Sequence, residues 1–259
     1  MKQAIANFLK YRFLLKELVK KGVKLKYRRS YLGIIWTLLE PLLTMIVLAV
    51  VFGTLFGNTD KTFPVYILTG RLFFSFFQQG TNGALKSIQS NAAQIKKVYV
   101  PKYLYPLANI LFNFVFFLLS LIVLVVVSAV LGVKPTIYIL EAIIPLINIL
   151  LLTFGVGMIL ATVGVYFRDI EYLWSVAIML IMYSSAIFYP AERILNSKFS
   201  WILKLNPIYG VIANFRNNVL YGQGLDVKLT LYSFGFSIVA IIVGLVFFKK
   251  KQDNFILHI

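Results

Sequence analysis

The chain contains six apolar runs of about the length that an α-helix needs to cross a membrane. Roughly twenty helical residues span the ~30 Å hydrocarbon core of a bilayer. Of the 259 residues, 60% are hydrophobic and 14% are charged, whereas a soluble domain has about 25% charged residues. We therefore predict an all-α integral membrane protein with a single domain over residues 1–259, and we exclude an ordinary soluble enzyme. The six predicted transmembrane helices are Ile34–Phe56, Phe63–Gly80, Leu107–Leu131, Ala142–Phe167, Tyr172–Tyr189 and Leu229–Phe248.

The distribution of basic residues predicts which ends of these helices face the cytoplasm. The chain has 26 Lys and Arg against nine Asp and Glu, a net charge of +17. With the N-terminus inside, eighteen basic residues fall on the cytoplasmic side and seven outside, and Arg71 falls within the second span. Because cytoplasmic loops carry an excess of Lys and Arg, we predict a multi-pass protein of the inner (cytoplasmic) membrane with both termini in the cytoplasm. The basic excess suits anionic membrane lipids, and no nucleic-acid partner is predicted.

Three segments outside the spans have patterns of their own. Residues 1–30 place apolar and basic residues on opposite faces at helical spacing, which indicates an amphipathic helix on the membrane surface; a solvated cytosolic helix is the alternative. Residues 85–100 are predicted to form a cytoplasmic helix. Its helical part is Ser87–Val100, and Pro101 ends it. Residues 190–227 are too apolar for a solvated loop and too short for two spans, so we expect short re-entrant helices that dip into the outer leaflet.

The sequence lacks the residues that most enzyme and metal sites need. It contains no cysteine and a single histidine, His258, beside the C-terminus. No GxxxxGK[ST] motif is present, so the chain is not expected to bind a nucleotide through a P-loop. Gly155, Gly157 and Gly164 fall in an apolar span, where small residues favour close helix packing. Because the sequence also has no DxD pair and no HExxH motif, we predict a transport protein without catalytic residues, metal site or cofactor of its own.

Three ionisable residues lie at membrane depth, where burying a charge is costly and a function is the default hypothesis. Glu40 falls in the first span, Arg71 in the second and Glu141 at the outer start of the fourth. In an ion-coupled carrier such residues form the proton or sodium relay. The alternatives are that Glu141 is merely interfacial, and that Arg71 pairs with an acid or extends outward to the interface.

Aromatic residues make up 16% of the chain and crowd the second and fifth spans. Interfacial belts and helix packing explain many of them. Aromatic rings also stack on the apolar faces of sugar rings, so a subset is a candidate lining for a saccharide path. These candidates are Phe73, Phe74, Phe77, Tyr183, Phe188 and Tyr189.

Five motifs follow one another along almost the whole chain. They are KYRRSYLGIIWTLLEPLL (26–43), FPVYILTGRLFFSFF (63–77), NAAQIKKVYVPKYLYP (91–106), VYFRDIEYLW (165–174) and LNPIYGVIANFRNNVLYG (205–222). In this order and spacing they resemble the motifs of ABC-2 type permeases that export lipid-linked polysaccharides, including O-antigen and wall teichoic acid. Arg71 departs from that family, because many members have an apolar residue after the glycine of the second span.

The resemblance implies a transporter with separate motor subunits. Two copies of the chain would form a homodimer with the polymer channel at their interface, and two ATPase subunits would bind ATP and Mg²⁺. These subunits would grip the cytoplasmic helix, here called the coupling helix, and their ATP-driven closure would open the channel to the lipid head group and then to the sugar chain. The residues assigned to ATPase coupling are Ser87, Gln94, Lys96, Lys97, Arg168 and Asp169.

Three arginines are candidates for the anionic head group of the lipid-linked substrate. Arg28 and Arg29 could gather a lipid pyrophosphate, since arginine makes bidentate contacts to phosphate; anchoring by the positive-inside rule explains them equally well. Arg71 could bind the same head group or have a purely structural role. Two other functions stay open, an ion-coupled secondary carrier and an ABC-2 permease for a small lipid or drug. The motifs do not distinguish O-antigen from teichoic acid.

Overall fold

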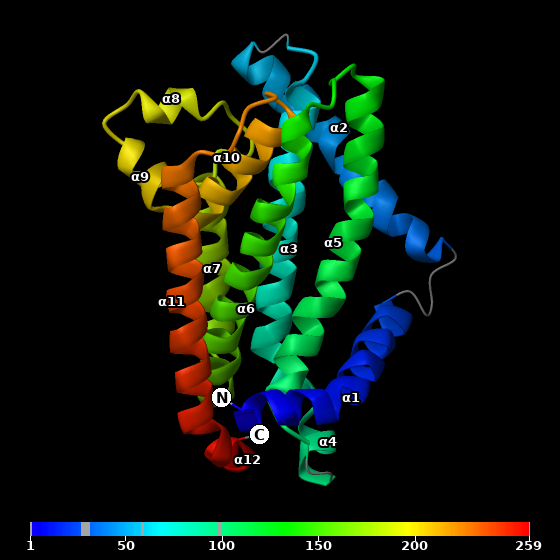
Figure 1. Cartoon of the computed structure of the whole chain (residues 1–259), viewed down its shortest axis with the longest axis vertical. Helices are drawn as coiled ribbons and strands as arrows, with labels where there is room; N and C mark the ends of the chain where they lie inside the picture. Colours follow the sequence, from blue (N-terminus) through cyan, green and yellow to red (C-terminus); the bar gives the residue numbers. More distant parts are fainter. Residues whose placement is uncertain (1, 27–31, 58–59, 98–99, 259) are drawn as a thin grey trace.

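The structure is a computed structural model that describes residues 2–26, 32–57, 60–97 and 100–258, with side chains from residue 10 onward. Within those ranges all regular secondary structure is helical, as the apolar runs predict. Long helices stand side by side, and helix α1 (Lys2–Lys26) lies across one end of the bundle (Figure 1). Helix α12 (Phe255–His258) lies at that same end, so the two termini approach one face of the bundle.

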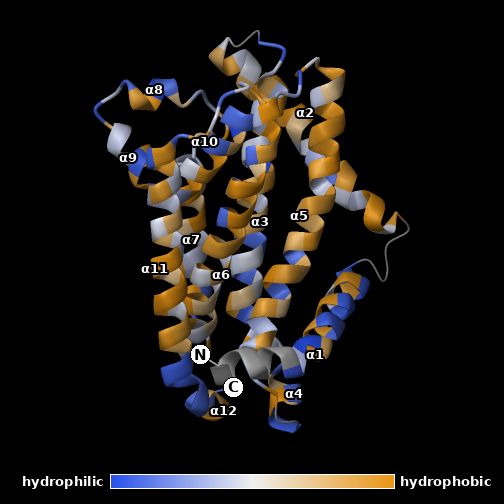
Figure 2. Cartoon of the chain, in the orientation of Figure 1, coloured by the Kyte–Doolittle hydropathy of each residue, from blue (hydrophilic) through white to orange (hydrophobic). Residues whose placement is uncertain are grey.

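Four helical stretches of the described chain are long and apolar enough to cross a membrane, and Figure 2 colours their hydrophobic residues orange. These stretches are Gly33–Phe56, Leu104–Val130, Ile137–Tyr166 and Val227–His258. They contain the helices α2 (Trp36–Phe56), α5 (Leu104–Val130), α6 (Ile143–Tyr166) and α11 (Val227–Lys251), with the short 3-10 helices η1 (Gly33–Ile35), η2 (Ile137–Ala142) and η3 (Gln252–Asn254). A helical membrane bundle is thus confirmed, with four spans by length and composition where six are predicted.

The other two predicted spans differ from their expected bounds. Helix α3 (Phe63–Ser90) starts as expected but continues well past Gly80. Its second half is polar, yet tertiary hydrogen bonds hold it, such as the one from Gln89 Nε2 to the carbonyl oxygen of Gly164 at 2.6 Å. Helix α7 (Ile170–Tyr183) has only 14 residues. Hydropathy alone therefore misplaces the ends of both helices.

The predicted coupling helix Ser87–Val100 is wrong in its bounds. Ser87 belongs to the last turn of α3, and helix α4 spans only Ala92–Lys97. Asn91 separates the two helices, and its Nδ2 donates to the carbonyl oxygen of Ser87 at 2.8 Å. This side chain satisfies an acceptor that the end of α3 leaves without a helical partner, so the chain turns here instead of continuing as one helix.

The outer connection, predicted as short re-entrant helices over residues 190–227, contains α8 (Glu192–Leu195), α9 (Ser200–Leu205) and α10 (Pro207–Val219). Asn206 caps α10, because its side chain accepts a hydrogen bond from the backbone nitrogen of Ile208 at 3.0 Å. Pro207 occupies the first helical position, where a missing N–H is harmless. Most of α10 is buried against neighbouring helices, which is where irregular outer backbone is expected to be stable.

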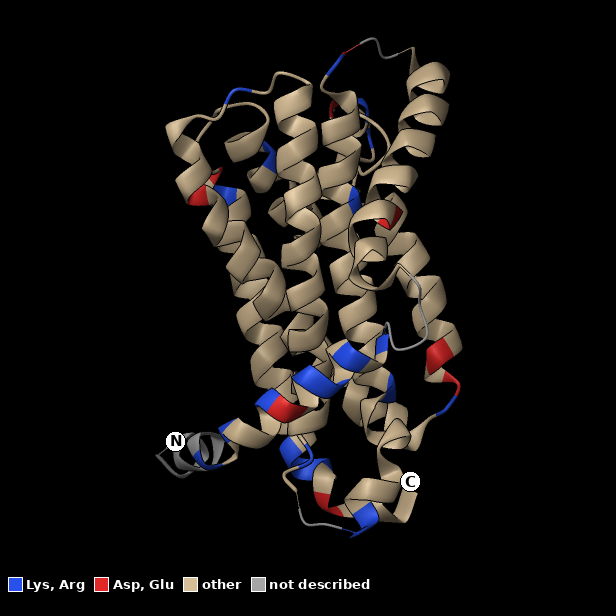
Figure 3. Ribbon diagram, turned by 90° about the vertical axis from the view of Figure 1, so that its right-hand side faces the viewer, with Lys and Arg blue, Asp and Glu red and all other residues tan. Residues whose placement is uncertain are grey.

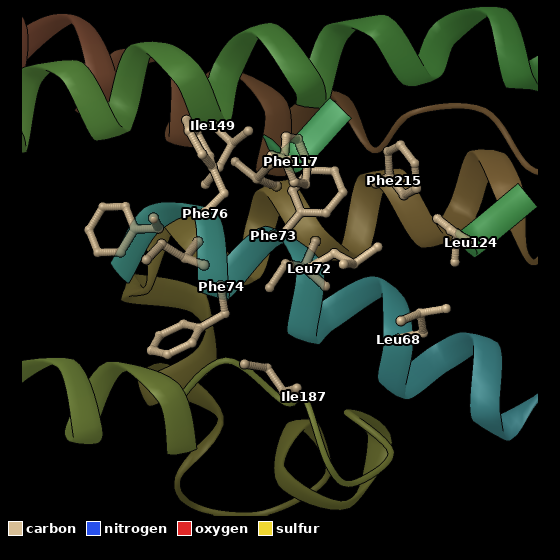
Figure 4. Packing of buried hydrophobic residues seen from close by; sticks show 14 of the residues in the cluster. Leu68, Leu72, Phe73, Phe74, Phe76, Phe117, Leu124, Ile149, Ile187 and Phe215 are labelled. Atoms are coloured by element: carbon tan, nitrogen blue, oxygen red, sulfur yellow. The ribbon is translucent and has the colours of Figure 1, made fainter. Parts of the chain in front are cut away.

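The core is centred on α3, whose buried side chains contact α5, α6 and α10 (Figure 4). Helices α6 and α11 approach most closely at glycines. A Cβ added at Gly155 would lie 2.6 Å from the backbone nitrogen of Ile241, and one at Gly244 would lie 2.8 Å from the carbonyl oxygen of Gly155. The prediction that small residues allow close packing here is confirmed. Charged residues gather on α1 and at the α4 end of the bundle (Figure 3).

Candidate functional site

Two of the three ionisable residues predicted at membrane depth meet at one cavity. Glu40 of α2 and Arg71 of α3 line a narrow space of about 60 Å³, enough for a few water molecules. Lys26, the last residue of α1, reaches the same space. Arg28 and Arg29, the other two head-group candidates, lie outside the described residues. The remaining polar side chains of the wall are Thr37, Thr44, Ser75, Gln79, Asn113 and Ser120.

The proline of α2 explains how this cavity is built. Pro41 has no backbone N–H, so the carbonyl oxygen of Thr37, one turn earlier, loses its helical hydrogen bond. The hydroxyl of Ser120 on α5 lies 3.3 Å from that oxygen and 2.9 Å from the carbonyl oxygen of Phe116 in its own helix, and it shares its one proton between the two acceptors. Thr44 Oγ1 donates to the carbonyl oxygen of Glu40 at 2.7 Å. The helical turn that carries Glu40 is therefore fastened to α5.

Glu40 and Arg71 face the same cavity without a direct contact. Glu40 and Arg71 are not in salt-bridge contact in the described chain, where the ion pairs are elsewhere, on α1 and between α3 and α7. The Lys26 ammonium lies 4.2 Å from the centre of the Phe116 ring. Burial lowers the pKa of Lys26, and the negative charge of Glu40 opposes that shift. Two cations and one carboxylate give the cavity a net positive charge, which favours an anionic ligand.

The third ionisable residue, Glu141, serves a different part of the molecule. Its carboxylate accepts hydrogen bonds from the backbone nitrogen of Leu225 at 3.1 Å and from Asn218 Nδ2 at 3.4 Å. These contacts fasten η2 to α10 and to the segment before α11. They give Glu141 a structural role, and they do not bring it to Glu40.

The prediction that Phe73 and Phe74 line a saccharide path is wrong for this structure. Both side chains are fully buried. The ring centre of Phe73 lies 5.1 Å from that of Phe117 and 4.6 Å from that of Phe215 (Figure 4). Aromatic rings at such distances pack in the core, so neither ring presents a surface to a passing polymer.

The remaining aromatic candidates are divided between core and surface. Phe77, Tyr183 and Tyr189 border a hollow of about 820 Å³ between α7 and the outer helices. Phe188 is 7% exposed and stacks on Phe52 with ring centres 5.1 Å apart. Tyr183 is 56% exposed, and with Tyr189 it gives this hollow an aromatic rim. A role for these residues in a saccharide path stays a prediction.

The residues assigned to ATPase coupling also differ in exposure. Ser87 is wrong as a contact residue, because it is fully buried and its Oγ donates to the carbonyl oxygen of Ala84 at 2.6 Å. The others lie on α4 and in the turn between α6 and α7, where they are half-exposed or exposed. They are Gln94, Lys96, Lys97, Arg168 and Asp169.

Sequence reasoning missed a buried arginine at the end of the bundle away from α1. Arg216 of α10, counted above among the outer basic residues, is 2% exposed. Its Nη1 donates to the carbonyl oxygen of Ala186 and its Nη2 to that of Tyr66, each at 2.9 Å. Gly70 makes room for it, since a Cβ there would lie 2.6 Å from Nη2. The available signal was a lone cation, without a nearby acid, in the amphipathic run IANFRNN.

A second missed feature joins α3 to α7. Lys86 and Glu171 form an ion pair at 2.7 Å, and the indole Nε1 of Trp174 donates to Thr81 Oγ1 at 3.2 Å. Both contacts lie toward the end of α3 that carries α4. They give the short helix α7 a polar connection to the long helix α3.

Comparison with known proteins gives matches along the chain. Residues 14–220 match the family model described as ABC-2 type transporter. The chain is 32% identical over 244 residues to the O-antigen export system permease protein RfbA of Klebsiella pneumoniae, and the aligned region covers 93% of each chain. It is 27% identical over 259 residues to RfbA of Myxococcus xanthus, 98% of each. It is also 22% identical over 236 residues to the polysialic acid transport protein KpsM of Escherichia coli, 90% of this chain and 91% of that protein.

Proposed function

Because the chain belongs to the ABC-2 type transporter family, we propose that it is the permease subunit of an ATP-driven exporter that moves a lipid-linked polysaccharide across the cytoplasmic membrane. The observation that carries this proposal is the end-to-end match, over 93% of each chain, with a permease named for O-antigen export. A protein named for polysialic acid transport matches over a similar share. O-antigen is the favoured cargo, and teichoic acid is the alternative polymer.

In the proposed arrangement the chain crosses the membrane six times. Helix α3 has 28 residues, which corresponds to about 42 Å of helix and exceeds the thickness of the hydrocarbon core. Helix α7 has 14 residues, about 21 Å, and crosses together with the turn that follows it. The position of α1 and α12 at one end of the bundle (Figure 1) supports two cytoplasmic termini, with the amphipathic α1 on membrane lipid.

In the same proposal two copies of the chain form the channel, and two ATPase subunits bind ATP and Mg²⁺. The absence of a P-loop from the sequence supports a separate motor. Helix α4 and the exposed turn at Arg168 and Asp169 offer that motor a basic, solvent-accessible surface. Lys86 and Glu171 then connect this surface to α7 through α3.

A co-purification experiment tests the motor assignment. The chain alone should have no ATPase activity, and the complex with its ATPase should hydrolyse ATP. Replacing Lys96 and Lys97 with glutamate should weaken co-purification of the ATPase while the chain still inserts into membranes. Undiminished co-purification of the ATPase with this variant would contradict docking at α4. Transport that survives ATP depletion and stops when the ion gradient collapses would instead support an ion-coupled carrier.

A further inference from the structure

A row of carboxamide side chains follows an open groove that leads to the Arg71 cavity. The groove has a volume of about 730 Å³ and lies between α1, α3 and α5. Lys26, Gln79 and Asn113 line both the groove and the cavity, so the two form one continuous polar depression. The carboxamides of the groove are Gln78, Gln79, Asn82, Asn109 and Asn113.

Much of the hydrogen-bonding capacity of these amides is unused. Asn113 Nδ2 donates to the backbone oxygen of Asn109 at 2.9 Å and to its Oδ1 at 3.2 Å. The side chains of Gln78, Gln79 and Asn82 make no hydrogen bond to the parts of the chain that the structure describes. Gln78 and Asn82 are half-buried and Gln79 is exposed, so their amides are accessible from the groove. Both the donors and the acceptors of these amides are thus available to a polar ligand.

An arginine and a lysine line the charged end of the depression. Arg71 is half-buried, and its guanidinium forms neither an ion pair nor a hydrogen bond with the described residues. Lys26 lines the same cavity, and Glu40 is the one acid among the lining residues. A guanidinium presents paired donors whose spacing matches two oxygens of a phosphate. This end of the depression therefore favours a phosphate group.

The order of these groups along α3 gives the ligand a direction. Arg71 lies deepest, and Gln78, Gln79 and Asn82 follow it toward the end of the helix that carries α4. On the proposed function, that end faces the cytoplasm. In a lipid-linked saccharide the phosphate lies between the lipid tail and the first sugar. Carboxamides both donate and accept hydrogen bonds, as sugar hydroxyls do, so the order of groups in the groove matches the order in the substrate.

We propose that this groove binds the head group of the lipid-linked substrate, with a phosphate at Arg71 and Lys26 and the first sugar along the carboxamides of α3 and α5. The proposal rests on the proposed function for its direction and its cargo. It assigns Gln78, Gln79, Asn82 and Asn109 a role in sugar recognition. Phospholipid head groups also carry phosphate and hydroxyls, so the experiment below separates the two sources.

Equilibrium binding to the full chain in phosphatidylcholine nanodiscs, followed by native mass spectrometry, tests the site. Three probes are compared: a polyprenyl diphosphate that carries one hexosamine, the same lipid without the sugar, and phosphatidylglycerol. The variants are Arg71→Gln, Arg71→Lys and Asn82→Leu. Lys134→Gln is the matched control, because Lys134 is exposed on the connection between α5 and η2. Thermal unfolding of each variant shows whether it is folded.

The phosphate and sugar parts of the site predict different losses. Arg71→Gln should lower the affinity for both diphosphate lipids by about ten- to a hundred-fold, as expected for lost hydrogen bonds to a charged group. Arg71→Lys should recover part of that affinity. Asn82→Leu should lower the affinity for the sugar-bearing lipid alone, by about three- to ten-fold. Lys134→Gln should bind all probes like the wild type.

Two binding results would overturn the site. One is unchanged affinity of folded Arg71→Gln and Asn82→Leu for the sugar-bearing lipid. The other is displacement of that lipid by an equal concentration of phosphatidylglycerol, which would indicate a general phospholipid site. Binding is measured without ATP or ATPase, so its failure is distinct from failure of ATP-driven export. Export with intact kinetics in Arg71→Gln would leave the proposed function in place and refute the groove.

Discussion

Replacing Arg216 with methionine removes contacts that hold helix α10 to α3 and to the turn after α7. Two donors of the guanidinium bind the carbonyl oxygens of Ala186 and Tyr66, each at 2.9 Å. The guanidinium carbon lies 3.4 Å from the centre of the Tyr66 ring. Ala186 has a φ of 47°, a left-handed conformation that is unfavourable for a residue with a Cβ. We therefore expect the turn to depend on Arg216.

The expected loss follows from what methionine leaves behind. Each hydrogen bond lost from a charged group costs about 1.5–3 kcal/mol, and a desolvated cation–π contact contributes about 2 kcal/mol. The carbonyl oxygen of Ala186 keeps one donor, the Tyr66 hydroxyl at 3.0 Å, and methionine avoids the cost of burying a charge. We therefore expect a net loss of about 2 kcal/mol of folding free energy, or roughly 4–8 °C in midpoint for a chain of this size.

Thermal unfolding of the detergent-solubilised chain, followed by fluorescence-detected gel filtration, measures this shift. Arg12→Met is the control, because Arg12 is exposed on α1. Gly70→Ala should cause a similar loss, since its Cβ would lie 2.6 Å from Arg216 Nη2. The double variant should lose less than the sum, because both changes disturb one contact. Equal midpoints for Arg216→Met and Arg12→Met would refute the role of the buried guanidinium.

Three further substitutions test the packing and the exposed contacts by the same assay. Gly155→Leu should destabilise the chain by about 1–3 kcal/mol or more through overpacking. Gly235→Leu is the control, because a Cβ at Gly235 has open space around it. Equal unfolding midpoints for these two variants would contradict the close approach of α6 and α11. Ser120→Ala should cost about 0.5–1.5 kcal/mol, because it removes the hydrogen bond from Ser120 Oγ to the Thr37 carbonyl oxygen, and an unchanged midpoint would contradict a contribution of this contact to stability. Lys86→Ala should cost less than about 1 kcal/mol, because the ion pair with Glu171 is exposed; a larger loss would indicate a cooperative network.

The sequence predicts a helix well when the boundaries of its apolar run lie close to the boundaries of the helix. Helices α2, α5, α6 and α11 each contain a long apolar segment, and the structure contains all four. Helix α3 runs past its apolar segment because its polar residues find tertiary partners, such as the Gly164 carbonyl oxygen for Gln89. Helix α7 stops before its apolar segment ends, in a turn that Arg216 and Tyr66 hold. These long-range contacts are invisible to a local hydropathy pattern.

The candidate site was predictable in its parts but not in its assembly. Glu40 and Arg71 stand out in the sequence because each is a charge in an apolar run. Their meeting depends on how α2 and α3 pack with α5, which no spacing rule gives. The carboxamides of the groove left a signal that was not used: Gln78 and Asn82 are four residues apart, as are Asn109 and Asn113, so each pair lies on one face of its helix.

ATP-dependent translocation in inside-out membrane vesicles tests the central claim most directly. Vesicles that contain the chain and its ATPase receive a lipid-linked polysaccharide on their outer, cytoplasmic leaflet, and a saccharide-cleaving enzyme in the lumen reports its arrival. We predict arrival only with ATP and with both proteins, undiminished when a protonophore collapses the ion gradient. Arrival without ATP that stops on gradient collapse would contradict the account, as would ATP hydrolysis that moves no saccharide.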